Sequence, residues 1–400
     1  MKSFSNRGLN IMKKTPGAHL WILVSTVGIS GLSQGMLLPL VAIILERDGF
    51  SSLSNGINAM ALYIAILLAS PFMEAPLRRF GYKPVMLAGG LSVAVALALF
   101  PAWKSFWFWF FLRFLIGIGD HFLHFSAQTW ITAASPENRR GRNVSLYGLF
   151  FGIGFAAGPV LTRLVTIDEA LPFMISSALS LLSWLFVWLL RNDFPDSDGT
   201  VGSSYKSSFS RFSKVLKIAW VSLLPPLGYG FLEASLNGNF PVLALRNGLD
   251  VSAVSIILPA FSIGGILFQF PLGVMSDKYG RRNVLMGIML TGFFCFIAAG
   301  IFYDSAIGLL ITFFLAGMAV GTTFSLGISY MADLLPRQLL PAGNLMCGIF
   351  FSLGSVSGPF FGGLAIQFTE GGSFFYLISV LLLIIFITLV VFKQPSPAKG

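Results

Sequence analysis

The fold is decided by a stretch of sequence that occurs twice. Residues 136–159 read PENRRGRNVSLYGLFFGIGFAAGP, and residues 336–359 read PRQLLPAGNLMCGIFFSLGSVSGP. The identical positions lie at an offset of 200 and are, in the first copy, Pro136, Gly148, Phe150, Phe151, Gly154, Gly158 and Pro159. In the second copy they are Pro336, Gly348, Phe350, Phe351, Gly354, Gly358 and Pro359. This agreement at a single offset indicates that the chain consists of two related halves.

The composition indicates a protein whose solvent is the lipid bilayer. Of the 400 residues, 55% are hydrophobic and 10% are charged, whereas an ordinary soluble domain has about 25% charged residues. So apolar a chain is not disordered. Two cysteines and three histidines are too few for a disulfide scaffold or a Cys/His metal module.

Twelve apolar runs are long enough to cross a bilayer, for which a helix needs about 20 residues. They begin near Leu20, Gly56, Val85, Phe106, Val144, Leu171, Val215, Val254, Val284, Ile307, Leu345 and Phe375. The predicted fold is an all-α membrane protein with 12 transmembrane helices. The longest connection separates six spans from six, so we predict an N-terminal six-helix bundle over residues 1–191, a cytoplasmic linker over 192–213 and a C-terminal six-helix bundle over 214–400.

The distribution of basic residues predicts the topology, because cytoplasmic connections carry an excess of Lys and Arg. With a cytoplasmic N-terminus, all but five of the 26 Lys and Arg fall on the cytoplasmic side. The exceptions are Arg47, Lys104, Arg163, Arg246 and, inside the fourth span, Arg113. We therefore expect a multi-pass protein of the cell membrane with both termini in the cytoplasm. The basic pI of 9.8 then reflects topology and not a nucleic-acid partner.

Duplicated six-span halves are typical of secondary transporters, in which one half moves against the other around a central site. The sequence contains no nucleophile–base set and no ATP-binding motif. We therefore expect a transporter that is not an enzyme, needs no cofactor or metal and draws its energy from an ion gradient.

A motif between the eighth and ninth spans carries a family resemblance. Residues 273–282 read GVMSDKYGRR and match the cytoplasmic loop signature Gly-x-x-x-Asp-(Arg/Lys)-x-Gly-Arg-(Arg/Lys). On this motif, and over nearly its whole length, the sequence resembles the major facilitator superfamily. The resemblance implies two pseudo-symmetric six-helix bundles that work by alternating access, and a cytoplasmic latch formed by Gly273, Asp277, Gly280 and Arg281. In the first half the same loop keeps Gly81 but has Arg78 in place of the acid.

The glycines of the repeated stretch strengthen the resemblance. Gly154-x-x-x-Gly158-Pro159 in the fifth span is similar to a motif of drug/proton antiporters, and Gly358 and Pro359 belong to a fuller copy in the eleventh span. The chain is most similar to that antiporter branch. Physically, small residues one turn apart let helices approach closely, and proline bends them.

Ionisable residues inside the spans are candidates for function, because a charge at bilayer depth costs upward of ~2.5 kcal/mol. In the fourth span Arg113, Gly117, Asp120 and His124 share a stripe about 60° wide at 100° per residue. The resemblance implies that this span lines the cavity. An acid, a cation and an imidazole on one face could carry a proton. The alternative is a static pair in which Asp120 and His124, at i and i+4, satisfy each other's polar groups and have no role in transport.

The seventh span offers a second acid. It begins with residues 225–230, PPLGYG, which we expect to break the regular helix where it lines a cavity. Tyr229, Glu233 and Asn237 follow one turn apart. An acid beside an aromatic ring suits a cationic amphiphile or a proton. The alternative is that Glu233 lies near the outer interface and reaches solvent.

These observations predict a secondary active transporter that couples protons to the efflux of a hydrophobic or amphipathic small molecule, cationic ones included. We assign proton coupling to Asp120, Glu233 and His124. We assign substrate binding to Gln34, which lies one turn from Ser30 on the first span, and to Arg113, Tyr229 and Asn237. We expect a monomer among membrane lipids.

Two alternatives stay open within the same fold and one outside transport. A flippase for a lipid-linked or anionic amphiphile would use Arg113 to hold the anionic head, and an uptake symporter would move its substrate inward. A membrane receptor or scaffold would have no reason to keep Asp120 and Glu233 in the membrane.

Overall fold

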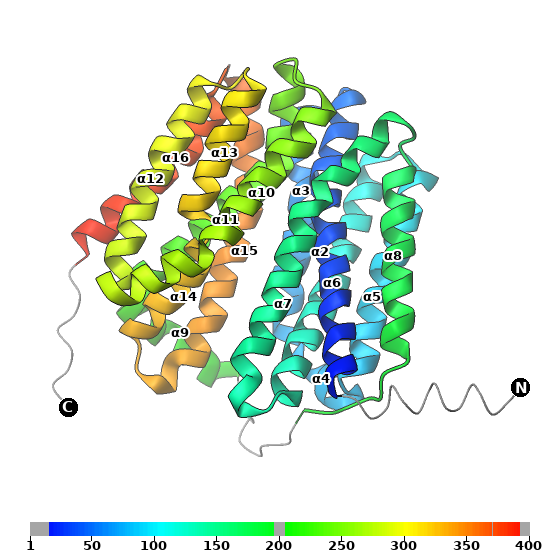
Figure 1. The fold of residues 1–400 in the computed structure, drawn as a ribbon, viewed down its shortest axis with the longest axis vertical. Coiled ribbons are helices and arrows are strands. Elements are labelled where there is room, and N and C mark those ends of the chain that lie inside the picture. Colours follow the sequence, from blue (N-terminus) through cyan, green and yellow to red (C-terminus); the bar gives the residue numbers. More distant parts are fainter. Residues whose placement is uncertain (1–15, 196–204, 370, 393–400) are drawn as a thin grey trace, which may run out of the picture. The chain divides into compact units, whose positions relative to one another are not determined.

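The chain folds into helices joined by short connections (Figure 1). A computed structural model describes residues 16–195, 205–369 and 371–392, and no β-strand occurs among them. The α-helices of the first half are α2 (Pro16–Arg47), α3 (Ser52–Ala69), α4 (Glu74–Phe80), α5 (Tyr82–Leu99), α6 (Phe106–Ala134), α7 (Glu137–Ala157) and α8 (Leu171–Trp188). Those of the second half are α9 (Tyr205–Ala219), α10 (Leu224–Arg246), α11 (Val251–Tyr279), α12 (Arg281–Ile301), α13 (Ala306–Val320), α14 (Thr323–Leu334), α15 (Leu340–Phe368) and α16 (Ser373–Val391).

Twelve stretches of this helical chain are long and apolar enough to cross a membrane, which confirms the predicted number of spans. Each begins within four residues of its predicted start. One span is built from α9 and α10, and another from α13 and α14. The predicted linker, residues 192–213, lies partly outside the described residues, and its last part forms the beginning of α9.

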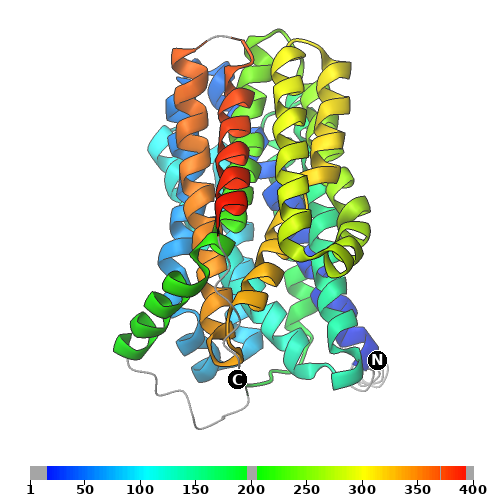
Figure 2. The ribbon, with the colours of Figure 1, turned by 90° about the vertical axis from the view of Figure 1, so that its left-hand side faces the viewer.

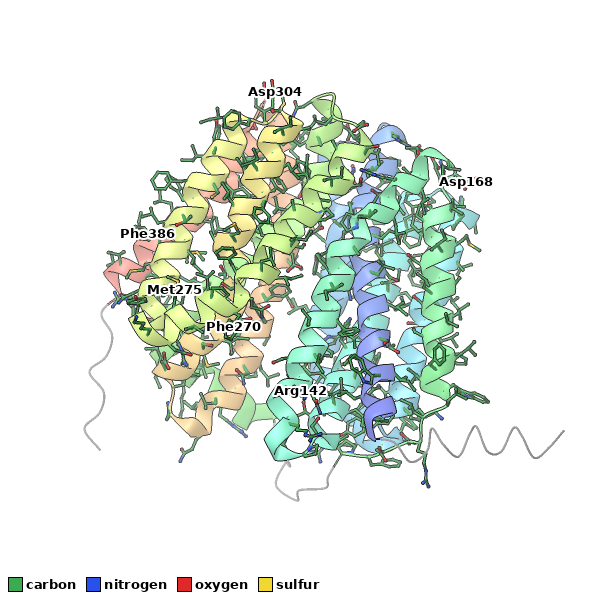
Figure 3. All side chains as sticks on the ribbon, viewed as in Figure 1. Arg142, Asp168, Phe270, Met275, Asp304 and Phe386 are labelled. Carbon is green, nitrogen blue, oxygen red and sulfur yellow. The ribbon has the colours of Figure 1, made fainter. Side chains whose placement is uncertain are left out.

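Large apolar side chains cover the outer surface of the helices. Phe270 on α11 is 80% exposed and Met275, one turn further along, is also exposed; both are labelled in Figure 3. Exposed aromatic side chains of this kind would be unfavourable in water but match a hydrocarbon solvent. In the N-terminal half, the charged residues Arg142 and Asp168 lie at opposite ends of the helices (Figure 3).

Contacts within the chain divide it into two units. The N-terminal unit contains residues 16–44 and 61–195, and the C-terminal unit contains residues 45–60 and the described residues from 205 onward. The C-terminal unit thus includes the end of α2 and the beginning of α3. Within it, Arg246 pairs with Glu46 at 2.7 Å, and the backbone N–H of Leu53 donates to Gln367 Oε1 at 3.3 Å.

In the N-terminal unit, glycines bring α7 against α2. A Cβ atom on Gly154 would overlap the backbone carbonyl oxygen of Gly28, and a Cβ on Gly158 would overlap the backbone of Gly35. Only glycine permits this backbone-to-backbone approach, which is how small residues pack membrane helices.

The same crossing recurs in the C-terminal unit between α15 and α10. A Cβ on Gly354 would overlap the carbonyl oxygen of Leu227, and one on Gly358 the carbonyl oxygen of Phe231. Figure 2 shows α15 running beside α16 along this unit. The repeated sequence therefore builds the same helix crossing twice, as a duplicated fold requires.

The prolines that follow these glycines act differently in the two units. Pro159 lies just after the end of α7, and the chain continues as a 3₁₀ helix over Gly158–Thr166. Pro359 stays inside α15, and its carbonyl oxygen accepts a hydrogen bond from Asn239 Nδ2 at 3.1 Å. The two copies thus share the helix crossing but not the helix end.

Two further glycines of the repeat adopt matching backbone conformations. Gly81, between α4 and α5, has φ +84°, and Gly280, between α11 and α12, has φ +87°. This region of φ is open to glycine without the steric cost that other residues meet. The two loops that carry the family signature therefore turn the chain in the same way.

Candidate functional site

Helix α6 carries the predicted acid of the N-terminal unit into its interior. Asp120 is 1% exposed and Arg113, two turns earlier, is fully buried. His121 and His124 are half-buried. The helix is apolar along most of its length, so these four side chains are the costly exceptions that a membrane helix retains only with partners or a function.

Asp120 is held by the first helix of the chain. Ser30 Oγ, on α2, donates to Asp120 Oδ1 at 2.6 Å. The other carboxyl oxygen, Oδ2, has no hydrogen-bond partner among the described residues. Asp120 thus has one oxygen fixed by α2 and one that is free to take a proton, a water molecule or a cation.

A small cavity of about 10 Å³ lies beside this carboxyl group. Its polar lining comes from Asp120, Ser30 and Thr26 and from two serines of α8, Ser180 and Ser183. About 10–15 Å³ is the space that one water molecule needs. The cavity beside Asp120 is therefore polar and about the size of one water molecule.

His124 joins the same group of side chains. Its Nε2 lies 3.0 Å from Ser30 Oγ and 3.3 Å from Gln34 Nε2, and its Nδ1 lies 2.9 Å from the hydroxyl oxygen of Tyr147 on α7. The predicted residues Asp120, His124 and Gln34 are thus together, with Ser30 between them. The direct Asp120–His124 pair that was considered as an alternative is replaced by a contact through Ser30.

Arg113 does not join this cluster. Its Nη2 donates to the backbone carbonyl oxygens of Leu37 and Leu38 at 3.2 and 3.1 Å, directly before Pro39 inside α2. Proline disturbs the helical hydrogen-bond ladder, and Arg113 supports the backbone at that point. Its Nε and Nη1 have no partner among the described residues.

His121 faces a different partner. Its Nε2 lies 3.0 Å from Ser70 Oγ, in the short 3₁₀ helix Ser70–Phe72 after α3. Ser70 also donates to the carbonyl oxygen of Ile66 at 2.7 Å. His121 therefore lies outside the Asp120 cluster.

The second predicted acid lies on α10 in the C-terminal unit. Glu233 is half-buried, and its carboxylate has no hydrogen bond or ion pair within the described part of the chain. Asn237 Nδ2 donates to the backbone carbonyl oxygen of Glu233 at 2.9 Å, and Tyr229 packs against Phe351 with ring centroids 6.3 Å apart. The acid therefore lies among an amide and aromatic rings with its charge uncompensated.

The predicted break in this span is present, but it lies just before the prolines: α9 ends at Ala219 and α10 begins at Leu224. Pro225 and Pro226 lie in the first turn of α10, where a missing N–H costs nothing, and the helix continues without interruption through Gly228 and Gly230. A 3₁₀ turn, Trp220–Leu223, precedes the prolines. The interruption of the span and the start of α10 are thus the same feature, and the glycines do not add a second break.

The loop signature of the second half forms an ion-pair cluster. Arg281 pairs with Asp333 at the end of α14, donates to the carbonyl oxygen of Ser329 at 3.0 Å and lies 3.4 Å from Asp277. Gly273 has open space at its Cβ position, so close packing does not explain it. Sequence reasoning missed Asp333, because no spacing relates it to the loop before the fold brings α14 alongside.

In the first half a different contact replaces this cluster. The backbone N–H of Tyr82 donates to the carbonyl oxygen of Asp193 at 2.9 Å, and Trp130 Nε1 donates to Asp193 Oδ2 at 3.0 Å. Asn192 Nδ2 donates to the carbonyl oxygen of Phe80 at 2.9 Å. The loop that lacks the signature acid is thus held by the chain that follows α8.

Twelve membrane helices, a duplicated helix crossing and titratable groups buried within the spans together define a secondary transporter, a protein of transport and not of catalysis. The family model of the Major Facilitator Superfamily matches residues 23–232 and 226–400. The chain belongs to the Major Facilitator Superfamily.

Known relatives and structures agree with this membership. The uncharacterised MFS-type transporter YfkF of Bacillus subtilis (strain 168) is 55% identical over 378 residues, 94% of this chain and 96% of the relative. The uncharacterised MFS-type transporter YcaD of Escherichia coli O45:K1 is 23% identical over 363 residues, 90% and 92% of the two chains.

Two solved structures share the fold. The nucleoside transporter NupG matches with a TM-score of 0.77 and 15% identity, over 94% of this chain and 99% of NupG. A bacterial homolog to the human lysosomal transporter Spinster, in an inward-facing and unoccupied conformation, matches with a TM-score of 0.71 and 15% identity over 95% of both chains. At this identity the likeness describes the fold alone.

Proposed function

We propose that the protein is a proton-coupled exporter of a hydrophobic or amphipathic small molecule. The observation that carries the proposal is the state of Asp120, a carboxyl group that is 1% exposed within a membrane helix and has one oxygen unpartnered. Asp120 carries the coupled proton, and the other members of its cluster position it.

The physical argument is the cost of charge in the membrane. An ionised carboxylate in a buried site needs a cation or several hydrogen bonds, and Asp120 receives one short hydrogen bond, from Ser30. A proton is the smallest cation that can neutralise the carboxylate of Asp120. Its arrival and departure change the charge of the site, and a transporter needs such a change to bias one conformation over another.

Glu233 indicates the class of substrate. Its unpaired carboxylate lies beside Tyr229, which packs against Phe351, so an acid and aromatic faces are available together. Cationic amphiphiles bind such sites by ion pairing and cation–π contact. Tyr229 and Asn237 are the proposed substrate contacts of this unit, and Gln34 is that of the N-terminal unit.

In the proposed cycle the substrate enters from the cytoplasm or inner leaflet while a proton leaves Asp120 or Glu233. Reprotonation of this acid from outside then returns the transporter to its initial state. We place the protein in the cell membrane with both termini in the cytoplasm, as a monomer that needs no cofactor besides the proton gradient. The Asp277–Arg281–Asp333 cluster acts as the cytoplasmic latch of this cycle.

The test is transport by the purified, reconstituted protein under a pH gradient imposed in each direction. Ethidium and tetraphenylphosphonium serve as cationic probes, and uridine is included because a nucleoside transporter shares the fold. We expect a cationic probe to accumulate only when protons flow the opposite way. Accumulation of a probe with the proton flow, or of uridine alone, contradicts the exporter proposal.

A second candidate function rests on Arg113. Its Nε and Nη1 have no partner among the described residues, so the guanidinium retains donors for an anion. This favours an anionic amphiphile, moved between leaflets, as the substrate. Dithionite quenching of a fluorescent phosphatidylglycerol analogue in proteoliposomes tests it: gradient-dependent flipping that Arg113→Gln abolishes supports this candidate, and no flipping above empty vesicles excludes it.

A further inference from the structure

Four polar side chains from three helices form one continuous hydrogen-bonded row in the N-terminal unit. Asp120 Oδ1 lies 2.6 Å from Ser30 Oγ, Ser30 Oγ lies 3.0 Å from His124 Nε2, and His124 Nδ1 lies 2.9 Å from the hydroxyl of Tyr147. The row crosses from α6 to α2, returns to α6 and ends on α7. Both nitrogens of His124 are therefore engaged.

The hydrogens of this row have two self-consistent arrangements. Ser30 has one hydroxyl hydrogen and two partners, so it donates to one and accepts from the other. If Asp120 is ionised, Ser30 donates to it and accepts from His124 Nε2–H, and Tyr147 donates to the bare Nδ1. The amide of Gln34, whose Nε2 lies 3.3 Å from His124 Nε2, then has to turn its oxygen toward Nε2–H, because an amide nitrogen can only donate. If Asp120 is protonated at Oδ1, it donates to Ser30, Ser30 donates to the bare Nε2, and Nδ1–H donates to Tyr147.

Burial decreases along the row. Asp120 and Ser30 are buried, whereas His124 and Tyr147 are half-buried. The row thus connects a buried carboxyl group on α6 with the hydroxyl of a half-buried tyrosine on α7. At the inner end, Asp120 lines the cavity of about 10 Å³, and its Oδ2 has no hydrogen-bond partner among the described residues.

Other charged or titratable groups near the row have partners elsewhere or point away. His121 contacts Ser70, and Arg113 donates to the carbonyl oxygens of α2. The cavity lining contributed by α5 and α8 contains serines and apolar side chains but no titratable group. Among the described residues, His124 and Tyr147 are therefore the titratable side chains that the row joins to Asp120.

We propose that Tyr147, His124 and Ser30 form a proton relay to Asp120, and that each passage converts His124 from its Nε2–H to its Nδ1–H tautomer. This proposal rests on the proton coupling proposed above and adds Ser30 and Tyr147 to it as residues that pass the proton on. A proton accepted at Nδ1 from Tyr147, which is itself reprotonated from the surface, releases the Nε2 proton to Ser30. Ser30 passes its own hydrogen to Asp120, so one proton enters, one carboxylate is neutralised, and no charge remains on the ring.

The test observes the tautomer directly. The chain has three histidines, so ¹⁵N-histidine labelling of the full-length protein in lipid nanodiscs gives three sets of ring signals, and those lost in His124→Gln identify His124. We expect the protonated nitrogen of His124 to change from Nε2 to Nδ1 as the pH is lowered from about 9 to about 5, without a doubly protonated ring. One tautomer throughout, or an imidazolium at low pH, overturns the relay.

Variants separate a relay from simple packing. Asp120→Asn and Ser30→Ala should each abolish the pH-dependent change of tautomer, whereas Ser30→Thr, which keeps the hydroxyl, should retain it. Tyr147→Phe should slow proton-driven transport about tenfold, the size expected for one lost hydrogen bond, and Tyr376→Phe on α16 is the matched control. A tautomer change that persists unaltered in Ser30→Ala overturns the proposal.

The tautomer measurement needs no substrate, so its outcome is independent of the transport assay. A tautomer change without proton-coupled transport would refute the proposed function and leave the relay standing. Proton-coupled transport without a tautomer change would refute the relay alone.

Discussion

The two carboxyl oxygens of Asp120 differ in their hydrogen bonding. Ser30 compensates one carboxyl oxygen, and the other has no partner among the described residues. A buried acid kept only for structure would be expected to have all of its acceptors filled, because an unfilled buried acceptor lowers stability by about 1–3 kcal/mol. The incomplete satisfaction of Asp120 is what a site for an exchangeable proton needs.

Replacing Asp120 by Asn tests this reading. Asn keeps the size of the side chain and an oxygen that accepts from Ser30, so we expect the folded protein to remain as stable as the wild type. Transport driven by a pH gradient should fall to the level of empty vesicles, because the site no longer exchanges a proton. The measurements are probe uptake in proteoliposomes and the thermal unfolding midpoint, and full uptake by Asp120→Asn would remove this residue from the mechanism.

Glu233 makes a separate prediction about substrate charge. Glu233→Gln removes the negative charge beside Tyr229 but keeps the shape of the side chain. We expect the apparent affinity for tetraphenylphosphonium to fall about tenfold or more, the loss of roughly 1.4 kcal/mol from one ion-pair and cation–π site. A neutral probe of similar size is the control, and equal losses for both probes would refute ion pairing by Glu233.

Where two helices cross at a glycine, we expect a larger side chain to destabilise the protein. Gly154 and Gly148 lie on the same helix, but only Gly154 would place a Cβ against backbone, while Gly148 has open space. Gly154→Ala should lower the free energy of unfolding by about 1–3 kcal/mol through overpacking. Gly148→Ala should leave it unchanged or raise it slightly, because alanine favours helix.

The C-terminal unit contains the same pair of packed and open glycines and allows the same comparison. Gly354→Ala should destabilise like Gly154→Ala, and Gly348→Ala should be as harmless as Gly148→Ala, because the same two environments recur. Thermal unfolding of the purified protein in detergent measures all four variants. Equal effects at the packed and the open glycines would contradict the proposed role of these crossings.

The Arg281 cluster links three helices of the C-terminal unit. Arg281→Asp should reduce transport severalfold, because it places three acids together at the end of α11, the start of α12 and the end of α14. The double variant R281D/D333R should recover part of the activity by restoring opposite charges. Lys278→Gln, which alters an exposed charge of the same loop, is the control, and a double variant as slow as R281D would argue against a latch formed by this pair.

Across the whole molecule, the sequence correctly predicted the features that depend on local patterns. Span number and the duplicated glycines follow from apolar runs and fixed spacing, and the structure confirms both. The helical angles of Asp120 and His124 correctly predicted that they share a face. They did not predict that Ser30 lies between them, because a helical wheel gives a face and not the neighbour that covers it.

Features that depend on tertiary packing could not be predicted in this way. Tyr147 is 23 residues from His124 and Asp333 is 52 residues from Arg281, and no motif connects either pair. Neither contact follows from sequence spacing, which does not record which element lies next to which. The prolines at 225 and 226, by contrast, mark the interruption of the seventh span locally, and the structure has it just before them.

Proton-coupled export requires that substrate and protons move in opposite directions through this molecule. The most direct test loads proteoliposomes with tetraphenylphosphonium and a pH-sensitive dye, imposes only the outward substrate gradient, and follows the internal pH. Coupled export predicts that the lumen acidifies as the probe leaves, and that Asp120→Asn abolishes the acidification. Efflux of the probe with no change of internal pH, or with alkalinisation, would contradict the claim.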